Sequence, residues 1–234
     1  MAGIREEELE IAGLRVVSVG EPDEARQVVL LLHGFQMQPR DLSPFAHSLR
    51  APAWFLFPEA PLAADGDVEG GRAWWHIDAK KRDQVLLNGP RDFAEQHPPD
   101  LPSARARLVS LVEALGPRIG SRPLVLGGFS QGAMLTCDTV LRSTFPLSAM
   151  LLLSGSRIAF DEWGSLLPNG RVRGLPTLVA HGKEDVDLAF AAGTALRDCP
   201  VSAGAEVTWQ PFEQGHEIPL VVWRTLRKVL AGLE

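Results

Sequence analysis

The sequence has no tyrosine, only two cysteines, and no apolar run near the roughly 18 residues that a membrane-spanning helix needs. Cys137 and Cys199 lie far apart and match no metal-binding spacing, so we assign them no function. Two thiols are compatible with a reducing compartment, and residues 1–10 are acidic, without the basic and apolar segments of an export signal. We therefore expect a cytoplasmic protein without a membrane span.

Positive charge is also scarce. The 23 lysines and arginines are outnumbered by 29 aspartates and glutamates, the formal net charge is −6, and no basic cluster marks a phosphate-binding surface. The six histidines form no HExxH pattern, the motif that would favour a metal site. We therefore expect no nucleic-acid partner, no metal and no other cofactor.

The hydrophobic pattern predicts an α/β fold. Apolar runs predict an edge strand at 14–19 and further strands at 28–32, 54–57, 124–127, 149–153, 177–182 and 206–209. Helical periodicity and capping signals predict helices at 39–49, 103–115, 131–141, 188–196 and 219–230. This alternation predicts a single domain over 1–234, with a mostly parallel central sheet and helices on both faces.

Two segments break the alternation of strands and helices. Residues 62–100 are rich in Gly and Asp with weak apolar periodicity, and residues 157–172 are also irregular. Long segments of this kind in compact domains are usually functional loops or lids. Trp74 and Trp75 lie in the first segment, and adjacent side chains of an extended segment face opposite ways. One should therefore pack on the domain body while the other faces a cleft.

The most informative stretch is Gly128-Phe129-Ser130-Gln131-Gly132, which lies between a strand-like run and a helix-like segment. A Gly-x-Ser-x-Gly pattern in that context is typical of a nucleophile elbow, a sharp turn that raises the serine above the end of a strand. The flanking glycines leave room for neighbouring backbone. Ser130 is therefore the predicted nucleophile.

A reactive serine needs a histidine as base and a carboxylate that orients the histidine. Asp185 follows the predicted strand at 177–182, and His216 follows the last predicted strand. The resulting chain order of serine, acid and histidine is that of α/β-hydrolases. The alternatives are Glu184 and Asp187 for the acid and His181 for the base.

The oxyanion of a tetrahedral intermediate needs preorganised N–H donors. The backbone N–H of Gln131 should supply one donor, because it directly follows the nucleophile. The backbone N–H of Phe35, in the loop after the strand at 28–32, should supply the second. His33 at the end of that strand is expected to be structural.

Six motifs carry a family resemblance: Leu32-His33-Gly34, Phe57-Pro58-Glu59-Ala60-Pro61, Arg72-Ala73-Trp74-Trp75, Gly128-Phe129-Ser130-Gln131-Gly132-Ala133, His181-Gly182-Lys183-Glu184-Asp185 and Gly215-His216. Together they resemble the bacterial phospholipase/carboxylesterase family of α/β-hydrolases, which includes relatives of acyl-protein thioesterases. The resemblance implies a metal-free serine esterase with Ser130, Asp185 and His216 as catalytic triad. It also implies an open cleft for small to medium acyl esters, with Trp75 rather than Trp74 on the cleft.

The sequence therefore predicts a serine carboxylesterase that acts on a small-molecule ester through an acyl-enzyme. The predicted substrate-binding residues are Phe35, Met37, Trp75 and Ile218. A thioesterase or lysophospholipase uses the same chemistry with another leaving group, so these alternatives stay open. A non-catalytic binding protein is disfavoured because no triad residue is missing, and a dienelactone-type hydrolase usually has Cys in place of Ser130. The sequence leaves both a monomer and a homodimer open.

Overall fold

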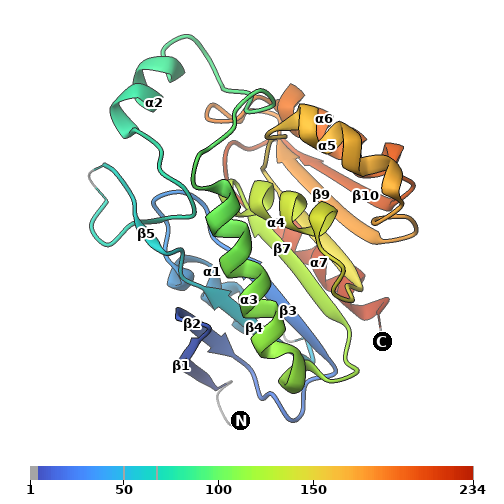
Figure 1. The fold of residues 1–234 in the computed structure, drawn as a ribbon. Coiled ribbons are helices and arrows are strands. Elements are labelled where there is room, and N and C mark those ends of the chain that lie inside the picture. The colour runs from blue at the N-terminus through green and yellow to red at the C-terminus, as the bar shows by residue number, and fades with distance from the viewer. Residues whose placement is uncertain (1–4, 50, 67, 234) are drawn as a thin grey trace.

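The computed structural model describes residues 5–49, 51–66 and 68–233, and its centre is an eight-stranded sheet (Figure 1). In spatial order the strands are β1 (Glu6–Ile11), β2 (Leu14–Val19), β4 (Ala53–Pro58), β3 (Gln27–Leu32), β7 (Leu124–Phe129), β8 (Ala149–Leu153), β9 (Pro176–Gly182) and β10 (Glu206–Phe212). β1, β2 and β4 pair antiparallel, and all pairs from β4 to β10 are parallel. The predicted, mostly parallel sheet is confirmed.

Helices cover both faces of this sheet, as predicted (Figure 1). One face carries α1 (Pro39–Leu49) and α7 (Leu220–Ala231), and the other carries α3 (Leu101–Ile119), α4 (Gln131–Arg142), α5 (Phe160–Leu166) and α6 (Phe190–Ser202). In α7, Val222, Trp223, Leu226 and Leu230 are buried against the sheet, whereas Leu220 begins the helix and is 67% exposed.

Two apolar layers enclose the sheet because successive residues of a strand point to opposite faces. In β3, Leu30 and Leu32 belong to the layer under α3 and α4, whereas Val29 and Leu31 belong to the layer under α1 and α7. All four side chains are buried. A strand that is buried on both faces must be apolar throughout, which explains the unbroken hydrophobic run in the sequence.

The antiparallel edge of the sheet differs from the prediction. Residues 14–19 form β2 as expected, but β2 is not the edge strand, because β1 pairs along its whole length. Four of the six residues of β1 are glutamates, so this segment lacks the apolar pattern that indicates a strand. Glu6 and Glu8 instead form ion pairs with Arg40 of α1.

The predicted bounds of two helices are also wrong. α3 begins at Leu101 after Asp100, two residues before the predicted start at residue 103. α3 also continues beyond Pro117 to Ile119. The early start is compatible with Pro102, since a proline in the first turn of a helix loses no intrahelical hydrogen bond. α6 runs to Ser202 rather than ending at residue 196.

The two segments predicted to be irregular contain short elements. Residues 62–100 form a pair of two-residue strands, β5 (Leu62–Ala63) and β6 (Arg72–Ala73), and the helix α2 (Ala79–Leu86). Residues 157–172 contain α5 and a 3-10 turn at Leu167–Asn169. Elements of this length are too short for hydrophobic periodicity to reveal. α2 projects from the body of the protein in Figure 1, and Ala79 is the one buried residue among its eight.

The strand order reverses between β3 and β7. The chain passes from β3 to β4 on one side and later places β7 on the other side of β3. In open α/β sheets, ligands bind beyond the carboxyl ends of the strands at such a reversal. The loops that follow β3 and β7 therefore occupy the position expected for a binding site. In the part of the chain that the structure describes, no helix has the length and apolarity to cross a membrane.

Candidate active site

Ser130 lies in the sharp turn between β7 and α4, with φ 54° and ψ −117°. This left-handed backbone conformation is rare for a residue with a side chain, and it is held here by very close packing. A Cβ on Gly128 would lie 2.2 Å from the carbonyl carbon of Gly132, and a Cβ on Gly132 would lie 2.5 Å from the carbonyl oxygen of Leu32. The two glycines are therefore a steric requirement of the turn.

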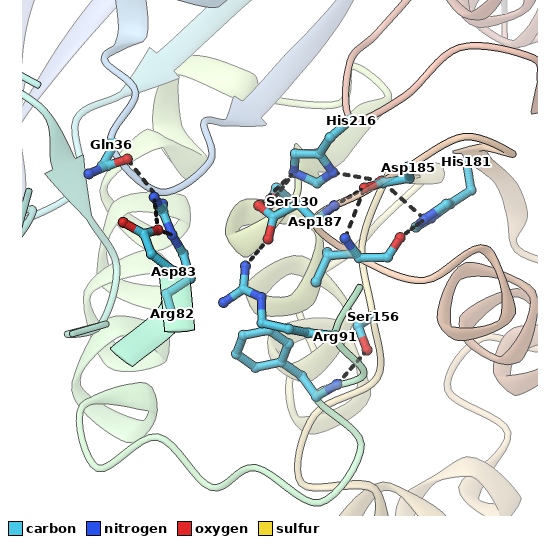
Figure 2. A network of polar contacts seen from close by, with 12 residues as sticks. Gln36, Arg82, Asp83, Arg91, Ser130, Ser156, His181, Asp185, Asp187 and His216 are labelled. Atoms are coloured by element: carbon cyan, nitrogen blue, oxygen red, sulfur yellow. Dashed lines mark hydrogen bonds and ion pairs between the residues drawn. The ribbon is translucent and has the colours of Figure 1, made fainter. Parts of the chain in front are cut away.

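The side chains of Ser130, His216 and Asp185 form a hydrogen-bonded chain (Figure 2). His216 Nε2 lies 2.9 Å from Ser130 Oγ, and His216 Nδ1 lies 2.7 Å from Asp185 Oδ2. Ser130 lies in the turn after β7, Asp185 in the loop after β9 and His216 in the loop after β10. These three segments meet at one edge of the sheet because the strands run in parallel. The structure thus brings together the three residues that the sequence singled out.

The carboxylate of Asp185 is buried and fully hydrogen-bonded. Its Oδ1 accepts from the backbone N–H groups of Asp187 at 2.9 Å and Leu188 at 2.8 Å, while its Oδ2 faces His216. Burial alone would raise the pKa of this carboxyl, but the hydrogen bonds from His181, His216 and the Leu188 N–H outweigh burial and hold the pKa well below its usual range. Asp185 therefore stays ionised beside His216 at neutral pH.

The alternative residues have other partners. His181 is buried, with Nε2 at 3.0 Å from the Leu188 carbonyl oxygen and 3.2 Å from Asp185 Oδ2. It therefore positions the acid rather than facing Ser130. Asp187 forms an ion pair with Arg91, and its Oδ2 is 3.9 Å from His216 Nε2, on the side of the imidazole that faces Ser130. Glu184 is exposed.

Phe35 and Gln131, whose N–H groups are predicted to form the oxyanion hole, belong to backbone segments next to Ser130. A Cβ on Gly34 would lie 3.2 Å from Ser130 Cβ, so the loop after β3 passes directly against the serine. Gln131 is the first residue of α4, where a backbone N–H has no intrahelical acceptor. Both residues line the same cavity as Ser130.

The cavity in front of Ser130 has a volume of about 230 Å³, and we call it the serine cavity. It is lined by Gly34, Phe35, Met37, Trp75, Ile77, Arg82, Arg91, Phe93, Phe129, Ser130, Gln131, Met134, Asp187, Leu188 and His216. Three of the four predicted substrate-binding residues are among them. The fourth, Ile218, packs instead with the apolar layer under α1 and α7, and its carbonyl accepts from Trp223 Nε1 at 3.0 Å.

The side chain of Gln131 holds the tryptophan pair. Its Oε1 accepts from the Trp74 N–H at 2.8 Å, and its Nε2 donates to the Trp75 carbonyl at 2.9 Å. Trp74 donates its indole N–H to the His33 carbonyl at 2.9 Å and does not line the serine cavity, whereas Trp75 does. Both indoles are only 1% exposed, so Trp75 is part of the core as well as part of the cavity wall.

The cavity residues that the sequence analysis did not predict include two arginines, Arg82 of α2 and Arg91. Both lie in the segment 62–100, where no strand end or motif indicated their position. Within the described ranges, no group of three or more His, Cys, Asp or Glu side chains is arranged to hold a metal ion.

A family model described as phospholipase/carboxylesterase matches residues 13–232. The chain belongs to this family. Acyl-protein thioesterase 1 of Kluyveromyces lactis is 29% identical over 192 residues, covering 77% of this chain and 78% of the relative. Esterase YpfH of Escherichia coli is 26% identical over 214 residues, covering 86% of this chain and 80% of the relative.

The fold matches the same group of proteins. The crystal structure of esterase PE8 superimposes with a TM-score of 0.74 at 22% identity, and the match covers 100% of both chains. The fold of this family member is therefore the α/β-hydrolase fold, and its family and relatives make it an esterase-type hydrolase of ester or thioester substrates.

Proposed function

We propose that the protein is a serine carboxylesterase that hydrolyses small to medium acyl esters through an acyl-enzyme. The observation that carries this proposal is the continuous chain of hydrogen bonds from Asp185 through His216 to Ser130, which ends at an open cavity. A nucleophile within hydrogen-bond reach of a base that is itself oriented by a carboxylate is the arrangement needed for acyl transfer.

In the first half of the reaction, Ser130 Oγ attacks the ester carbonyl carbon and its proton passes to His216 Nε2. The backbone N–H groups of Phe35 and Gln131 stabilise the oxyanion, at about 3 kcal/mol for each donor. The bond to the alcohol oxygen then breaks, and the alcohol leaves with the proton from Nε2. The product of this half is an ester between the acyl group and Ser130.

In the second half, water attacks the acyl-enzyme and gives a proton to His216 Nε2. Ser130 Oγ then leaves the carbonyl carbon and takes that proton back, which releases the carboxylic acid. Asp185 accepts a hydrogen bond from Nδ1–H. The neutral imidazole therefore has its free electron pair on Nε2, the nitrogen that faces Ser130. Asp185 also stabilises the imidazolium that forms in each half.

The dimensions of the serine cavity support small to medium acyl esters. Its volume of about 230 Å³ lies below the roughly 300–1,000 Å³ of pockets that hold drug-sized ligands. Its walls include Met37, Trp75, Phe93 and Phe129, which offer apolar surface to an acyl chain. Each methylene buried against such a wall contributes about 0.8 kcal/mol.

Thioester hydrolysis is the second candidate. The relative from Kluyveromyces lactis is named an acyl-protein thioesterase, and a thiol is an alternative leaving group for the same acyl-enzyme. Lysophospholipase activity is a further alternative, in keeping with the family description. Two further points stay predictions, namely a single domain over 1–234 and a cytoplasmic location. Both a monomer and a homodimer stay open.

The test compares p-nitrophenyl acetate, butyrate and octanoate with the corresponding acyl thioesters. Ser130→Ala and His216→Ala should each lower kcat by about a millionfold, because the two side chains act as one unit. Ser165→Ala and His47→Ala are matched controls at residues outside the serine cavity and should keep full activity. An organophosphonate should add its mass to Ser130 alone. Ester hydrolysis by Ser130→Ala at a tenth of the wild-type rate or more would refute the mechanism.

A further inference from the structure

Two arginines line the serine cavity on the side formed by the segment 62–100. Arg82 comes from α2, and Arg91 follows that helix in the chain. Figure 2 shows both side chains on the same side of Ser130, with Arg91 pointing toward Asp187 beside the serine. A guanidinium is always charged and offers five N–H donors, so it is a costly group to place in a pocket for a purely apolar ester.

Arg91 is held rigidly at the wall of the serine cavity. Its N–H donates to the Asp187 carbonyl at 2.9 Å, and its carbonyl accepts from the Ala189 N–H at 2.9 Å. Its guanidinium pairs with the Asp187 carboxylate and stacks over the Phe93 ring, 4.8 Å from the ring centre. The side chain is only 12% exposed. The Arg91 guanidinium is therefore fixed at the cavity wall, and a ligand that binds to it causes little loss of side-chain entropy.

Arg82 is held in place by weaker partners. Its Nη1 donates to Gln36 Oε1 at 3.1 Å, and its guanidinium lies 5.4 Å from the centre of the Phe35 ring. Its carboxylate partner, Asp83, lies at 2.9 Å but its side chain is 63% exposed. An ion pair to an exposed carboxylate is screened by water, so it neutralises the charge of Arg82 only in part.

The ionised groups of the serine cavity have a positive balance. The lining contains the two arginines and one carboxylate, Asp187, which leaves a formal charge of +1 with His216 neutral, in a chain whose net charge is −6. A groove of about 390 Å³ continues from the cavity and shares both arginines. It adds Lys81 and two aspartates.

The two aspartates of the groove have other partners. Asp78 caps α2 by accepting from the Lys81 N–H at 2.9 Å. Asp92 accepts from Ser156 Oγ at 3.0 Å and lies 3.7 Å from Arg157. The positive charge of Arg82 and Arg91 is therefore the part of this surface best placed to meet a bound molecule.

We propose that the preferred substrates are esters that carry a carboxylate group, which Arg82 and Arg91 bind at the wall of the serine cavity. This inference rests on the proposed esterase function and adds the charge of its substrate. A guanidinium matches the geometry of a carboxylate, and charge-assisted hydrogen bonds of this kind are the stronger ones in proteins. The carboxylate is located on either the acyl part or the leaving group, and the substrates below distinguish the two.

The experiment measures kcat/KM for two matched pairs of esters. The first pair is para-acetoxybenzoate and para-acetoxybenzamide, which differ in the charge of the leaving group. The second pair is the mono-p-nitrophenyl ester of adipic acid and its terminal amide, which differ in the charge of the acyl part. In at least one pair, the wild-type protein should prefer the anionic ester by about tenfold, as expected for a charge-assisted hydrogen bond. Added salt should reduce this preference.

The variants locate the preference. Arg82→Gln and Arg91→Gln should each lower the anionic-to-neutral ratio of kcat/KM by about tenfold. Lys80→Gln is the matched control, because it removes one positive charge from the same helix at an exposed residue outside the serine cavity. Its ratio should stay at the wild-type value. If Arg91→Gln fails to fold, Arg82→Gln decides the question alone.

The outcomes separate this inference from the proposed function. If the neutral esters are hydrolysed but the anionic ones are not preferred in either pair, the inference is wrong and the esterase function stands. The inference is also wrong if Lys80→Gln lowers the ratio as much as Arg82→Gln does. The preference would then arise from the overall positive charge of α2 rather than from a contact with Arg82. If no ester of either charge is hydrolysed, the proposed function itself fails.

Discussion

His33 couples acid pH to the stability of the loop that carries Phe35. It directly follows β3 and is only 1% exposed. Its Nδ1 donates to the Gly34 carbonyl at 2.8 Å, and its Nε2 accepts from the Ala60 N–H at 3.0 Å. This pair of bonds fits only the neutral imidazole with its proton on Nδ1, since a second proton on Nε2 would face another N–H. Burial, the largest influence, lowers the pKa of His33 to about 4.

The sign of the pH effect follows from this lowered pKa. In the unfolded chain a histidine titrates near 6.5, so between about pH 6.5 and about pH 4 the unfolded state binds a proton that the folded state does not. The stability that neutral His33 gives is complete above this window and is lost as the pH falls through it. The difference of about 2.5 pKa units corresponds to about 3 kcal/mol of unfolding free energy.

Urea unfolding at a series of pH values from 7 down to about 4 measures this loss. His33→Gln is the matched variant, because an amide can donate and accept at similar places but does not titrate in this range. The unfolding free energy of the wild type should fall more steeply with pH than that of His33→Gln, with a total difference of about 3 kcal/mol. Equal pH dependence in both proteins would show that a buried neutral His33 has no part in acid sensitivity.

Three further predictions concern the acid, the elbow and the cavity wall. Asp185→Asn should lower kcat about ten-thousandfold by disturbing the imidazole tautomer, whereas the exposed Glu184→Gln should change it less than about threefold; steady-state kinetics of both decide this. Gly132→Ala should lower the free energy of unfolding by about 3 kcal/mol or more, because its Cβ would lie less than 3 Å from two backbone carbonyls. Urea unfolding measures this, and a variant as stable as the wild type would contradict the packing of the elbow. Trp74→Ala and Trp75→Ala should both lower the melting temperature, but only Trp75→Ala should change the preference among acetyl, butyryl and octanoyl esters.

The parallel part of the sheet was predictable because its strands are buried on both faces. Such strands must be apolar at every position, so β3, β7 and β8 stand out in the sequence without any knowledge of their neighbours. β1 could not be found in this way. Two of its glutamates, Glu6 and Glu8, pair with Arg40 of α1, a partner more than 30 positions away that no local pattern reveals.

The same contrast holds for the candidate site. Ser130, Asp185 and His216 each follow a recognisable strand, so topology alone indicates that their loops meet at one edge of the sheet. Arg82 and Arg91 belong to a segment whose path depends on many weak contacts, such as the hydrogen bond between Gln36 and Arg82. No rule of spacing predicts such a path, and the sequence analysis missed both.

The side chain of Gln131 shows how this segment is tied to the catalytic turn. It bonds the Trp74 N–H and the Trp75 carbonyl, so the cavity wall at the tryptophan pair is fixed to the residue that directly follows Ser130. α2 lacks comparable anchoring, because Ala79 is its one buried residue. Local opening is easiest where few apolar contacts are buried. Any lid-like motion of the segment 62–100 should therefore involve α2 and Arg82 while Trp75 stays in place, which would change access for a charged group more than the shape of the apolar wall.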